Sequence, residues 1–283
     1  MFTRIPLTVV VCTLNEAHHI EKCITNILVN LPAEILVIDA SSDDDTLVRC
    51  PRSENVYIHR TGRLGLLHQR LYAARQAKYD TIAFIDADDF IEPKSLAQNY
   101  QFMLDKGLDG VMFRIRAYST ETWWQKGWDV LVQLLTEKSK QIDTLGRPCI
   151  TRRDHLLLVA EPAEPIYTED TYIAMTLARK LGSLKFMVGP GLSMRDFPSN
   201  FSSNLEKFIK YGEGDYQNMV IHKKYVSLVF HQLIRYPVLR GLSSFRYSKV
   251  HLLFFFVVGF FRFYGTVKAA KTSFFRRIFR DVS

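Results

Sequence analysis

The sequence predicts an α/β fold, in which a mixed, mainly parallel sheet is flanked by helices and followed by a helical extension. Three observations predict it. Short apolar strands alternate with helical patterns over the first ninety residues, several strands end on polar residues, and the composition changes near residue 205. Alternating strands and helices are typical of a parallel, doubly wound sheet. A chain of 283 residues with 47% hydrophobic residues can form one large α/β domain with an appendage.

Apolar periodicity places the first elements. Runs rich in β-branched residues predict strands, and apolar residues at three- and four-residue spacing predict helices. The Ser- and Asp-rich loop 40–46 predicts a short helix capped by Asp45 or a neighbour. In chain order the expected strands are 7–12, 34–38, 56–59 and 81–86, and the expected helices between them are 20–28 and 66–78.

The middle of the chain is less regular. Helices are expected at 92–107 and 169–181, and a strand at 110–117. All three tryptophans, Trp123, Trp124 and Trp128, fall between these elements. Core packing is the favoured interpretation of this cluster. The alternative is an aromatic platform for a sugar or a lipid, because aromatic faces pack on apolar ligand surfaces.

The net charge of +8 is concentrated in the tail. Residues 205–283 contain 14 Lys and Arg against 4 Asp and Glu, a balance of +10, whereas residues 1–204 contain 23 against 25, a balance of −2. This asymmetry indicates an anionic partner of the tail itself. It gives no indication of nucleic-acid binding by the whole chain, and we expect no nucleic-acid partner.

The tail also contains two apolar, aromatic-rich segments, 225–239 and 250–268, with Lys and Arg between them. The longest uncharged run, 250–261, has twelve residues, whereas a spanning helix needs about 20. We therefore expect helices that lie in a membrane interface. A buried helical hairpin and a dimer interface are the alternatives. The expected domains are a catalytic domain at 1–215 and a basic helical extension at 216–283.

The cysteines and the N-terminus indicate the compartment. Cys12, Cys23, Cys50 and Cys149 have neither the close spacing of metal ligands nor a dense disulfide pattern, so reduced thiols in the cytosol are expected. The apolar run 7–12 is too short for the core of a signal peptide. The expected location is the cytoplasm, peripheral at the cytoplasmic face of the membrane.

Acidic residues follow the fourth expected strand. Residues 81–85 are apolar in four of five positions, and Asp86, Asp88 and Asp89 come next. Ligands of open α/β sheets collect at the carboxyl ends of the strands. Two carboxylates one residue apart can hold a hard divalent cation, and the cation can bind a diphosphate. The alternative is a solvated acidic turn.

Two other predicted strands also end on polar residues. Thr13, Asn15 and Glu16 follow the first strand, and Asp39 follows the second. The order and spacing of these groups resemble the family 2 glycosyltransferases, which have a nucleotide-sugar-binding α/β fold called GT-A. The matching segments are VVVCTLNEAHHI, EILVIDASSDDDT, GLLHQR, FIDADD and YTED, and the resemblance covers roughly residues 5–215.

The resemblance implies a role for each polar group. Asp39 would accept a hydrogen bond from a uracil or guanine ring N–H, and Thr13, Asn15 and Glu16 would line the nucleoside pocket. Arg70, in a G-x(4)-R segment, would meet the base or the phosphates. Asp88 would bind a metal ion, Mn²⁺ or Mg²⁺, directly, and Asp86 would face the ribose or a metal-bound water.

The resemblance also implies a catalytic base at Asp170, in the segment Thr168-Glu169-Asp170. An inverting transfer is an in-line displacement, so one carboxylate must take the proton of the acceptor hydroxyl, a contribution of roughly 10²–10⁴-fold in rate. The alternative is that these acids only stabilise a first helical turn, by about 0.3–1 kcal/mol each.

The sequence departs from the family pattern in two places. Leu71 follows Arg70 where relatives often have Asn, and 192–198 contains no His where many relatives have a further metal ligand. A water, Arg195 or Asp196 would then take the place of that His. Lys210 lies in a segment similar to the Y-G-x-G segment of lipid-acceptor relatives. It would approach a diphosphate or lie at a solvated helix end.

The expected function is an inverting, metal-dependent glycosyltransferase. It would move a sugar from a nucleotide-diphosphate sugar, with UDP or GDP as the nucleotide, to a lipid-linked or glycan acceptor at a membrane surface, as in polysaccharide biosynthesis. One alternative is a degenerate relative that binds a nucleotide sugar without transfer. A nucleotidyltransferase is the other, and the absence of glycine from residues 13–17 argues against its phosphate loop.

Overall fold

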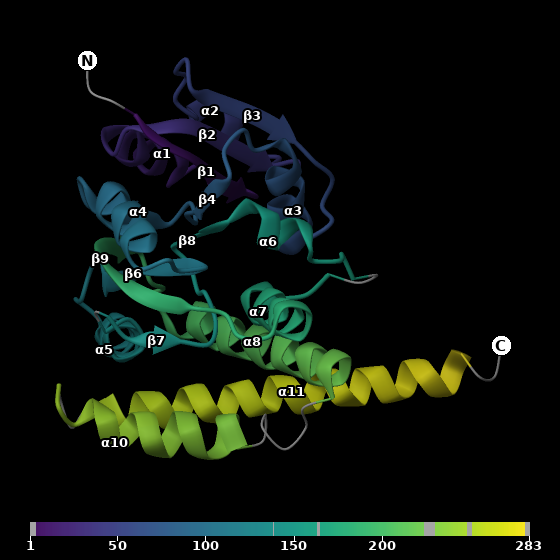
Figure 1. Cartoon of the computed structure of the whole chain (residues 1–283). Helices are drawn as coiled ribbons and strands as arrows, with labels where there is room; N and C mark the ends of the chain where they lie inside the picture. The colour runs from purple at the N-terminus through teal and green to yellow at the C-terminus, as the bar shows by residue number, and fades with distance from the viewer. Residues whose placement is uncertain (1–3, 138, 163–164, 224–229, 248–250, 281–283) are drawn as a thin grey trace. The chain divides into compact units, whose positions relative to one another are not determined.

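The computed structural model describes residues 4–137, 139–162, 165–223, 230–247 and 251–280 (Figure 1). The chain divides into two compact units. The first contains Met1–Tyr118, Thr136–Pro165 and Asp170–Asp196, and the second contains Ser119–Leu135, Ile166–Glu169 and Phe197–Ser283. The predicted boundary between residues 215 and 216 falls inside a helix of the second unit, α8.

A mixed sheet is the centre of the first unit. Within the described residues it has nine strands in the order β3-β2-β1-β4-β8-β6-β9-β5, and β7 pairs with β9. The pairs β1–β2, β2–β3, β1–β4 and β6–β9 are parallel, and the remaining pairs are antiparallel. The strands are β1 (Ile5–Thr13), β2 (Pro32–Asp39), β3 (Val56–Arg60), β4 (Thr81–Phe84), β5 (Asp89–Ile91), β6 (Gly110–Ala117), β7 (Gln141–Ile142), β8 (Cys149–Arg152) and β9 (Phe186–Arg195). This architecture confirms the predicted fold class.

Helices flank this sheet. Side chains alternate along a strand, so Val9 and Val11 of β1 face one side and Val10 the other. Val9 and Val11 belong to a buried cluster that includes Ile24 of α1 and Leu96 of α4. The helices of this unit are α1 (Ile20–Val29), α2 (Thr46–Arg49), α3 (Leu66–Gln76), α4 (Ser95–Asp105), α6 (Arg153–Leu157) and α7 (Glu169–Leu181), whose first residue belongs to the second unit.

The expected elements agree with the observed ones within a few residues, and two differences bear on the site. β4 ends at Phe84, two residues before the predicted end, so Asp86 lies in a loop. The residues from Asp89 form a strand, β5, that sequence analysis missed. The helix near Thr46 is present, and Asp44 rather than Asp45 accepts a hydrogen bond from its first backbone N–H, at 3.0 Å.

The second unit is helical. It contains α5 (Trp123–Leu135), α8 (Phe201–His222), the π-helix η1 (His231–Arg240), α10 (Gly241–Ser244) and α11 (Leu252–Arg280), and α8 and α11 run alongside each other (Figure 1). Of the predicted segment 225–239, residues 225–229 lie outside the described residues. The tryptophans pack in the core of this unit: Trp128 stacks on Phe197 with ring centroids 5.0 Å apart, and its indole N–H donates to Asn204.

α8 and α11 approach each other closely. A Cβ on Gly212 would lie 1.9 Å from the carbonyl oxygen of Arg262, and one on Gly265 would lie 2.2 Å from that of Ile209. Both glycines are therefore required by helix packing. The segment that resembles Y-G-x-G thus lies within a helix, and Lys210 pairs there with Glu206 at 2.8 Å.

α11 is longer than the twelve-residue uncharged run indicated. By length and composition, Leu252–Ser273 is apolar enough to cross a membrane, with about a third of that window buried (33%). Arg262 interrupts the uncharged run without ending the helix, because Asp215 of α8 accepts its Nε–H at 2.6 Å and its Nη2–H at 2.9 Å.

Candidate functional site

The predicted polar residues gather at the carboxyl-end edge of the parallel strands. Thr13 and Asp39 are register partners at the ends of β1 and β2, and Asp86 follows β4, which pairs with β1 on its other side. Strands β2, β1 and β4 are therefore neighbours, and their carboxyl ends point the same way. The first unit thus has one polar edge made by three strand ends.

Asp39 is fully buried and holds this edge together. Its Oδ1 accepts hydrogen bonds from the hydroxyls of Thr13 and Ser42, at 3.1 and 2.5 Å, and its Oδ2 accepts from the backbone N–H of Ser42 at 2.9 Å. Arg60 approaches Oδ2 with its Nε at 3.8 Å. A carboxylate with this many donors is held in one orientation.

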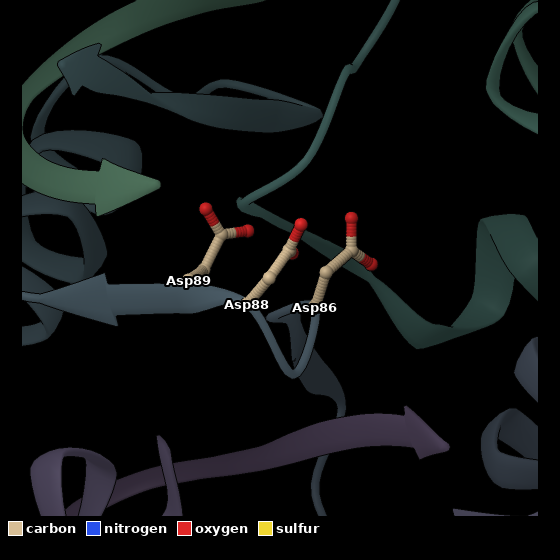
Figure 2. Close-up of side chains that lie close together, drawn as sticks. All are labelled: Asp86, Asp88 and Asp89. Atoms are coloured by element: carbon tan, nitrogen blue, oxygen red, sulfur yellow. The ribbon is translucent and has the colours of Figure 1, made fainter. Parts of the chain in front are cut away.

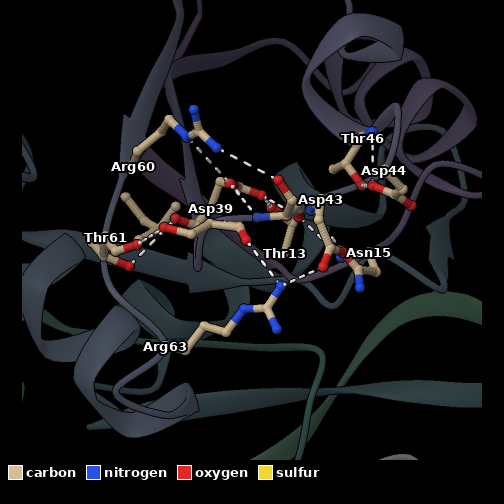
Figure 3. A network of polar contacts seen from close by, with 12 residues as sticks. Thr13, Asn15, Asp39, Asp43, Asp44, Thr46, Arg60, Thr61 and Arg63 are labelled. Atoms are coloured by element: carbon tan, nitrogen blue, oxygen red, sulfur yellow. Dashed lines mark hydrogen bonds and ion pairs between the residues drawn. The ribbon is translucent and has the colours of Figure 1, made fainter.

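The loop after β1 is fixed against the loop after β2 (Figure 3). Asn15 has a left-handed backbone, with φ of 60°; its side-chain oxygen accepts from the backbone N–H of Asp43, and its own backbone N–H donates to Ser42. The backbone N–H of Glu16 donates to Thr46 at 2.8 Å. The three residues predicted to line a nucleoside pocket, Thr13, Asn15 and Glu16, thus lie in one cross-linked pair of loops.

Asp86 and Asp88, in the loop after β4, lie side by side with Asp89 at the start of β5 (Figure 2). One oxygen from each carboxylate lies within 4.8 Å of the others. Asp89 is fully buried, whereas the side chains of Asp86 and Asp88 are about a third exposed, at 32% and 29%. Asp88 therefore combines carboxylate chemistry with access from solvent.

Two arginines contact this cluster. The buried Arg70 of α3 donates from Nη2 to Asp86 Oδ1 at 3.1 Å. Arg195, at the end of β9, donates from Nη2 to Asp86 Oδ2 at 3.1 Å and from Nε to Asp89 Oδ1 at 2.8 Å, and it also bonds the second oxygen of Asp89. Its Nε lies 4.0 Å from Asp88. Both oxygens of Asp86 are thus occupied by guanidinium groups.

Burial and neighbouring charge have opposite effects on the pKa values of Asp89 and Arg195. Burial raises the pKa of Asp89 to about 7, although the Arg195 guanidinium opposes this rise. The three carboxylates raise the pKa of Arg195 well above its ordinary value against the effect of its burial, so Arg195 is a permanent cation.

Asp170 lies near this edge, within the first unit. It lines a small cavity of about 20 Å³, room for about one water molecule, with Phe84, Arg147 and Cys149 among the other lining residues. The backbone oxygen of Arg147 accepts from Nη2 of Arg195 at 3.0 Å, which connects this cavity to the acidic cluster. Oδ1 of Asp170 accepts the backbone N–H of Thr171 at 2.7 Å in the first turn of α7.

The segment before Asp170 is fixed within the second unit. Asn218 of α8 donates to the backbone oxygen and to the hydroxyl of Thr168, at 3.1 and 2.6 Å. Gly214 allows this approach, because a Cβ there would lie 2.8 Å from the Thr168 side chain. α8 therefore sets the position of the residues that lead into Asp170.

Sequence analysis missed two residues of this edge. Arg147 gave no signal, because its position depends on the fold around β8. His19 lies between two acids: its Nδ1 is 3.1 Å from Glu16 and its Nε2 is 3.7 Å from Asp196. The hydrogen bond with Glu16 raises the pKa of His19. The sequence signal for this contact was the spacing of His19 three residues after Glu16.

The acidic cluster fits a hard divalent cation in its chemistry. Mg²⁺ and Mn²⁺ prefer oxygen ligands, and Mg²⁺ keeps several waters while bound to one or two carboxylates and substrate phosphates. Asp88 is the carboxylate that can serve as a direct ligand without losing a hydrogen bond to Arg70 or Arg195. Asp86 can take part through a bound water.

The sequence profile described as glycosyl transferase family 2 matches residues 8–152, which is just over half of the chain. The chain belongs to glycosyl transferase family 2. It is therefore a glycosyltransferase of the GT-A type, and the matched range contains all of the predicted site residues except Asp170. No curated protein matches the sequence.

Solved structures share the fold at low sequence identity. The chain resembles a structure of S. aureus TarS 1-349 with a TM-score of 0.52 and 16% identity, covering 80% of this chain and 66% of that one. It resembles TarS 1-349 in complex with UDP-GlcNAc with a TM-score of 0.53 and 16% identity, covering 80% of this chain and 73% of that one. For a mycobacterial protein the TM-score is 0.54 and the identity 16%, covering 75% of this chain and 73% of that one. The chain spans 40% of the longer TarS structure.

Proposed function

We propose that this family 2 glycosyltransferase transfers a sugar, with inversion, from a nucleotide-diphosphate sugar to a lipid-linked or glycan acceptor at a membrane surface. One observation carries the proposal. The strand-end acids Asp39, Asp86 and Asp88 lie on one edge of a single compact unit that also contains Asp170. A donor bound along this edge would have its nucleoside at Asp39 and its diphosphate at Asp88.

Each end of the edge supplies a different part of the chemistry. A divalent cation held by Asp88 would neutralise the diphosphate leaving group. Asp170 would accept the proton of the acceptor hydroxyl as that oxygen attacks the anomeric carbon, and the nucleoside diphosphate would leave from the opposite face. The hydrogen bond from Thr171 N–H holds Oδ1 of Asp170 at the start of α7.

The donor half of the proposal is supported by the fold and by one relative. A structure of TarS 1-349 contains UDP-GlcNAc, and another contains UDP. Asp39 suits the ring N–H of uracil or guanine, so UDP or GDP is the nucleotide we propose. Side chains outside this edge would determine which sugar is transferred.

Thermal unfolding with a nucleotide panel tests the donor. Selective binding stabilises the folded state by about 2.7 kcal/mol at a hundredfold excess over the dissociation constant, which corresponds to about 5 °C or more for a chain of this size. With Mn²⁺ present, UDP or GDP should raise the melting temperature selectively over dTDP and CDP. Equal shifts for all four, or no shift, would contradict the donor assignment.

The membrane half of the proposal rests on the second unit. Leu253, Phe256, Phe260 and Tyr264 of α11 form an exposed apolar stripe at helical spacing, with exposed fractions of 47–64%. No Asp or Glu occurs between residues 216 and 280. Apolar and basic groups without acids are typical of a helix that lies on anionic lipid.

A peripheral location agrees better with the packing than a spanning α11. Arg262 lies at the middle of Leu252–Ser273 and forms a buried ion pair with Asp215 of α8. Moving α11 into hydrocarbon would break this pair, at a cost of about 3–5 kcal/mol, or carry the charges of α8 with it. We propose a cytoplasmic enzyme, peripheral at the membrane face.

A further inference from the structure

Arg195 occupies an unusual place among the acids of the site. It is the last residue of β9, and β5 pairs with β9 so that Asp89 and Arg195 are register partners. The side chain of Arg195 is 15% exposed. Backbone pairing, rather than a flexible loop, therefore brings the guanidinium to the acidic cluster.

The contacts of Arg195 use two of its three nitrogens. Nε and Nη2 bind both oxygens of Asp89, and Nη2 also reaches Asp86 Oδ2 at 3.1 Å and the backbone oxygen of Arg147 at 3.0 Å. Nη1 has no hydrogen-bond partner among the described residues, although it belongs to the same rigid, planar group. A guanidinium held in this way can bind one more anionic oxygen without moving.

Charge balance gives this arrangement a consequence for metal binding. Three carboxylates are in direct contact with two guanidinium groups, those of Arg70 and Arg195, so the cluster has at most one negative charge in excess. The affinity of an oxygen site for a hard cation rises with the charge of its ligands. A cluster with this charge balance is a weak site for a divalent cation until further anionic ligands arrive.

We propose that Arg195 is the resident cation of this site and makes binding of the divalent metal depend on the donor diphosphate. It occupies Asp86 and Asp89, leaves Asp88 as the direct ligand, and offers Nη1 to a phosphate oxygen. The metal then enters with the nucleoside diphosphate, whose oxygens supply the missing negative ligands. Only the identity of that anion rests on the proposed function.

Mn²⁺ titrations of the full chain without nucleotide test the inference. The wild-type protein should bind Mn²⁺ alone weakly, with a dissociation constant of about 1 mM or above, and UDP should tighten binding about tenfold or more. Arg195→Gln removes one positive charge from the cluster. It should tighten Mn²⁺ binding without nucleotide at least about tenfold.

Two variants serve as controls. Arg152 forms a two-contact pair with Asp154 on an exposed part of the same unit, so Arg152→Gln should leave Mn²⁺ binding unchanged. Arg195→Lys keeps the charge and should stay within about threefold of the wild type. Circular dichroism checks that each variant is folded.

Micromolar binding of Mn²⁺ to the wild-type protein without nucleotide would overturn the inference, and so would unchanged or weaker binding in Arg195→Gln. The wild-type measurement decides the question even if Arg195→Gln does not fold. Because no sugar donor is present, these results are independent of whether the protein transfers a sugar. If the wild-type protein transfers no sugar but binds Mn²⁺ as predicted, the proposed function alone is contradicted.

Discussion

At the residue scale, Asp39 combines a structural and a recognition role. Its buried carboxylate accepts three hydrogen bonds from Thr13 and Ser42, which join the ends of β1 and β2 to the loop after β2. The same carboxylate is the proposed acceptor for the base of the donor. A substitution at Asp39 alone therefore changes stability and nucleotide binding together, and a second variant must separate them.

Asp39→Asn should lower the free energy of unfolding by about 1–3 kcal/mol, because an amide N–H₂ would face one of these donors. It should also abolish the selective stabilisation by UDP or GDP. Ser42→Ala removes the hydroxyl contact but keeps the carboxylate, so it should lower stability and retain selectivity. Denaturant unfolding and nucleotide titration measure the two effects. Equal loss of nucleotide binding in both variants would leave Asp39 with a structural role only.

The residues of the edge differ in how far the sequence predicts them. Asp39, Asp86 and Asp88 follow apolar strands directly, so local pattern places them at strand ends. Arg195 comes more than a hundred residues after Asp86, and its contacts depend on the pairing of β5 with β9. Such long-range pairing has no local signature, and neither does the approach of Arg147.

At the element scale, the contact between α8 and α11 depends on glycine. Gly212 and Gly265 lie where any Cβ would meet a backbone oxygen of the facing helix at about 2 Å, 1.9 and 2.2 Å respectively. Helices that approach this closely cannot accommodate even a methyl group without a shift of the backbone. The contact also brings Arg262 to Asp215, so packing and ion pairing depend on each other.

Gly212→Ala should therefore lower the free energy of unfolding of the second unit by about 1–3 kcal/mol, even though alanine has the higher helix propensity. Gly62→Ala is the matched control, because its Cβ would meet only Leu64 at an ordinary 3.7 Å. Chemical denaturation followed by tryptophan fluorescence reports on this unit, since the three tryptophans lie in or next to its core. A stabilising effect of Gly212→Ala would contradict the described packing.

Local periodicity predicts most elements, and the exceptions have physical causes. β5 is three residues long and acidic at its start, so it has no strand pattern of its own. β4 ends two residues early because its partner β8 begins at Cys149, the residue that pairs with Phe84. The predicted helix 92–107 begins at Ser95, after Lys94 in a left-handed conformation.

At the scale of the whole molecule, the charge asymmetry and the apolar tail belong to one helical unit. The sequence predicts this tail from composition alone. It does not predict that α5, about seventy residues earlier, belongs to the same unit, because that depends on packing of Trp128 against Phe197 and Phe208. The boundary at 215/216 stays a prediction of sequence analysis.

The double variant Phe256→Ser, Phe260→Ser should weaken binding to vesicles of anionic phospholipid at least about tenfold, because each exposed Phe loses the burial of its ring in the acyl region. Co-sedimentation with such vesicles measures the binding, and added salt should weaken it further. Val48→Ser removes an even more exposed apolar side chain from the first unit and should have no effect. Unchanged binding of the double variant would favour a protein partner on this stripe.

We propose that Asp170 activates the acceptor for attack on a nucleotide-bound sugar. Release of nucleoside diphosphate from UDP- and GDP-sugars, with acceptor-containing membranes and Mn²⁺, measures this step. Asp170→Asn keeps the size of the side chain and its acceptor oxygen for Thr171. It should lower kcat by about 10²–10⁴-fold while the melting-temperature shift with nucleotide is unchanged. Turnover by Asp170→Asn at a rate close to that of the wild-type enzyme would show that Asp170 is not the base.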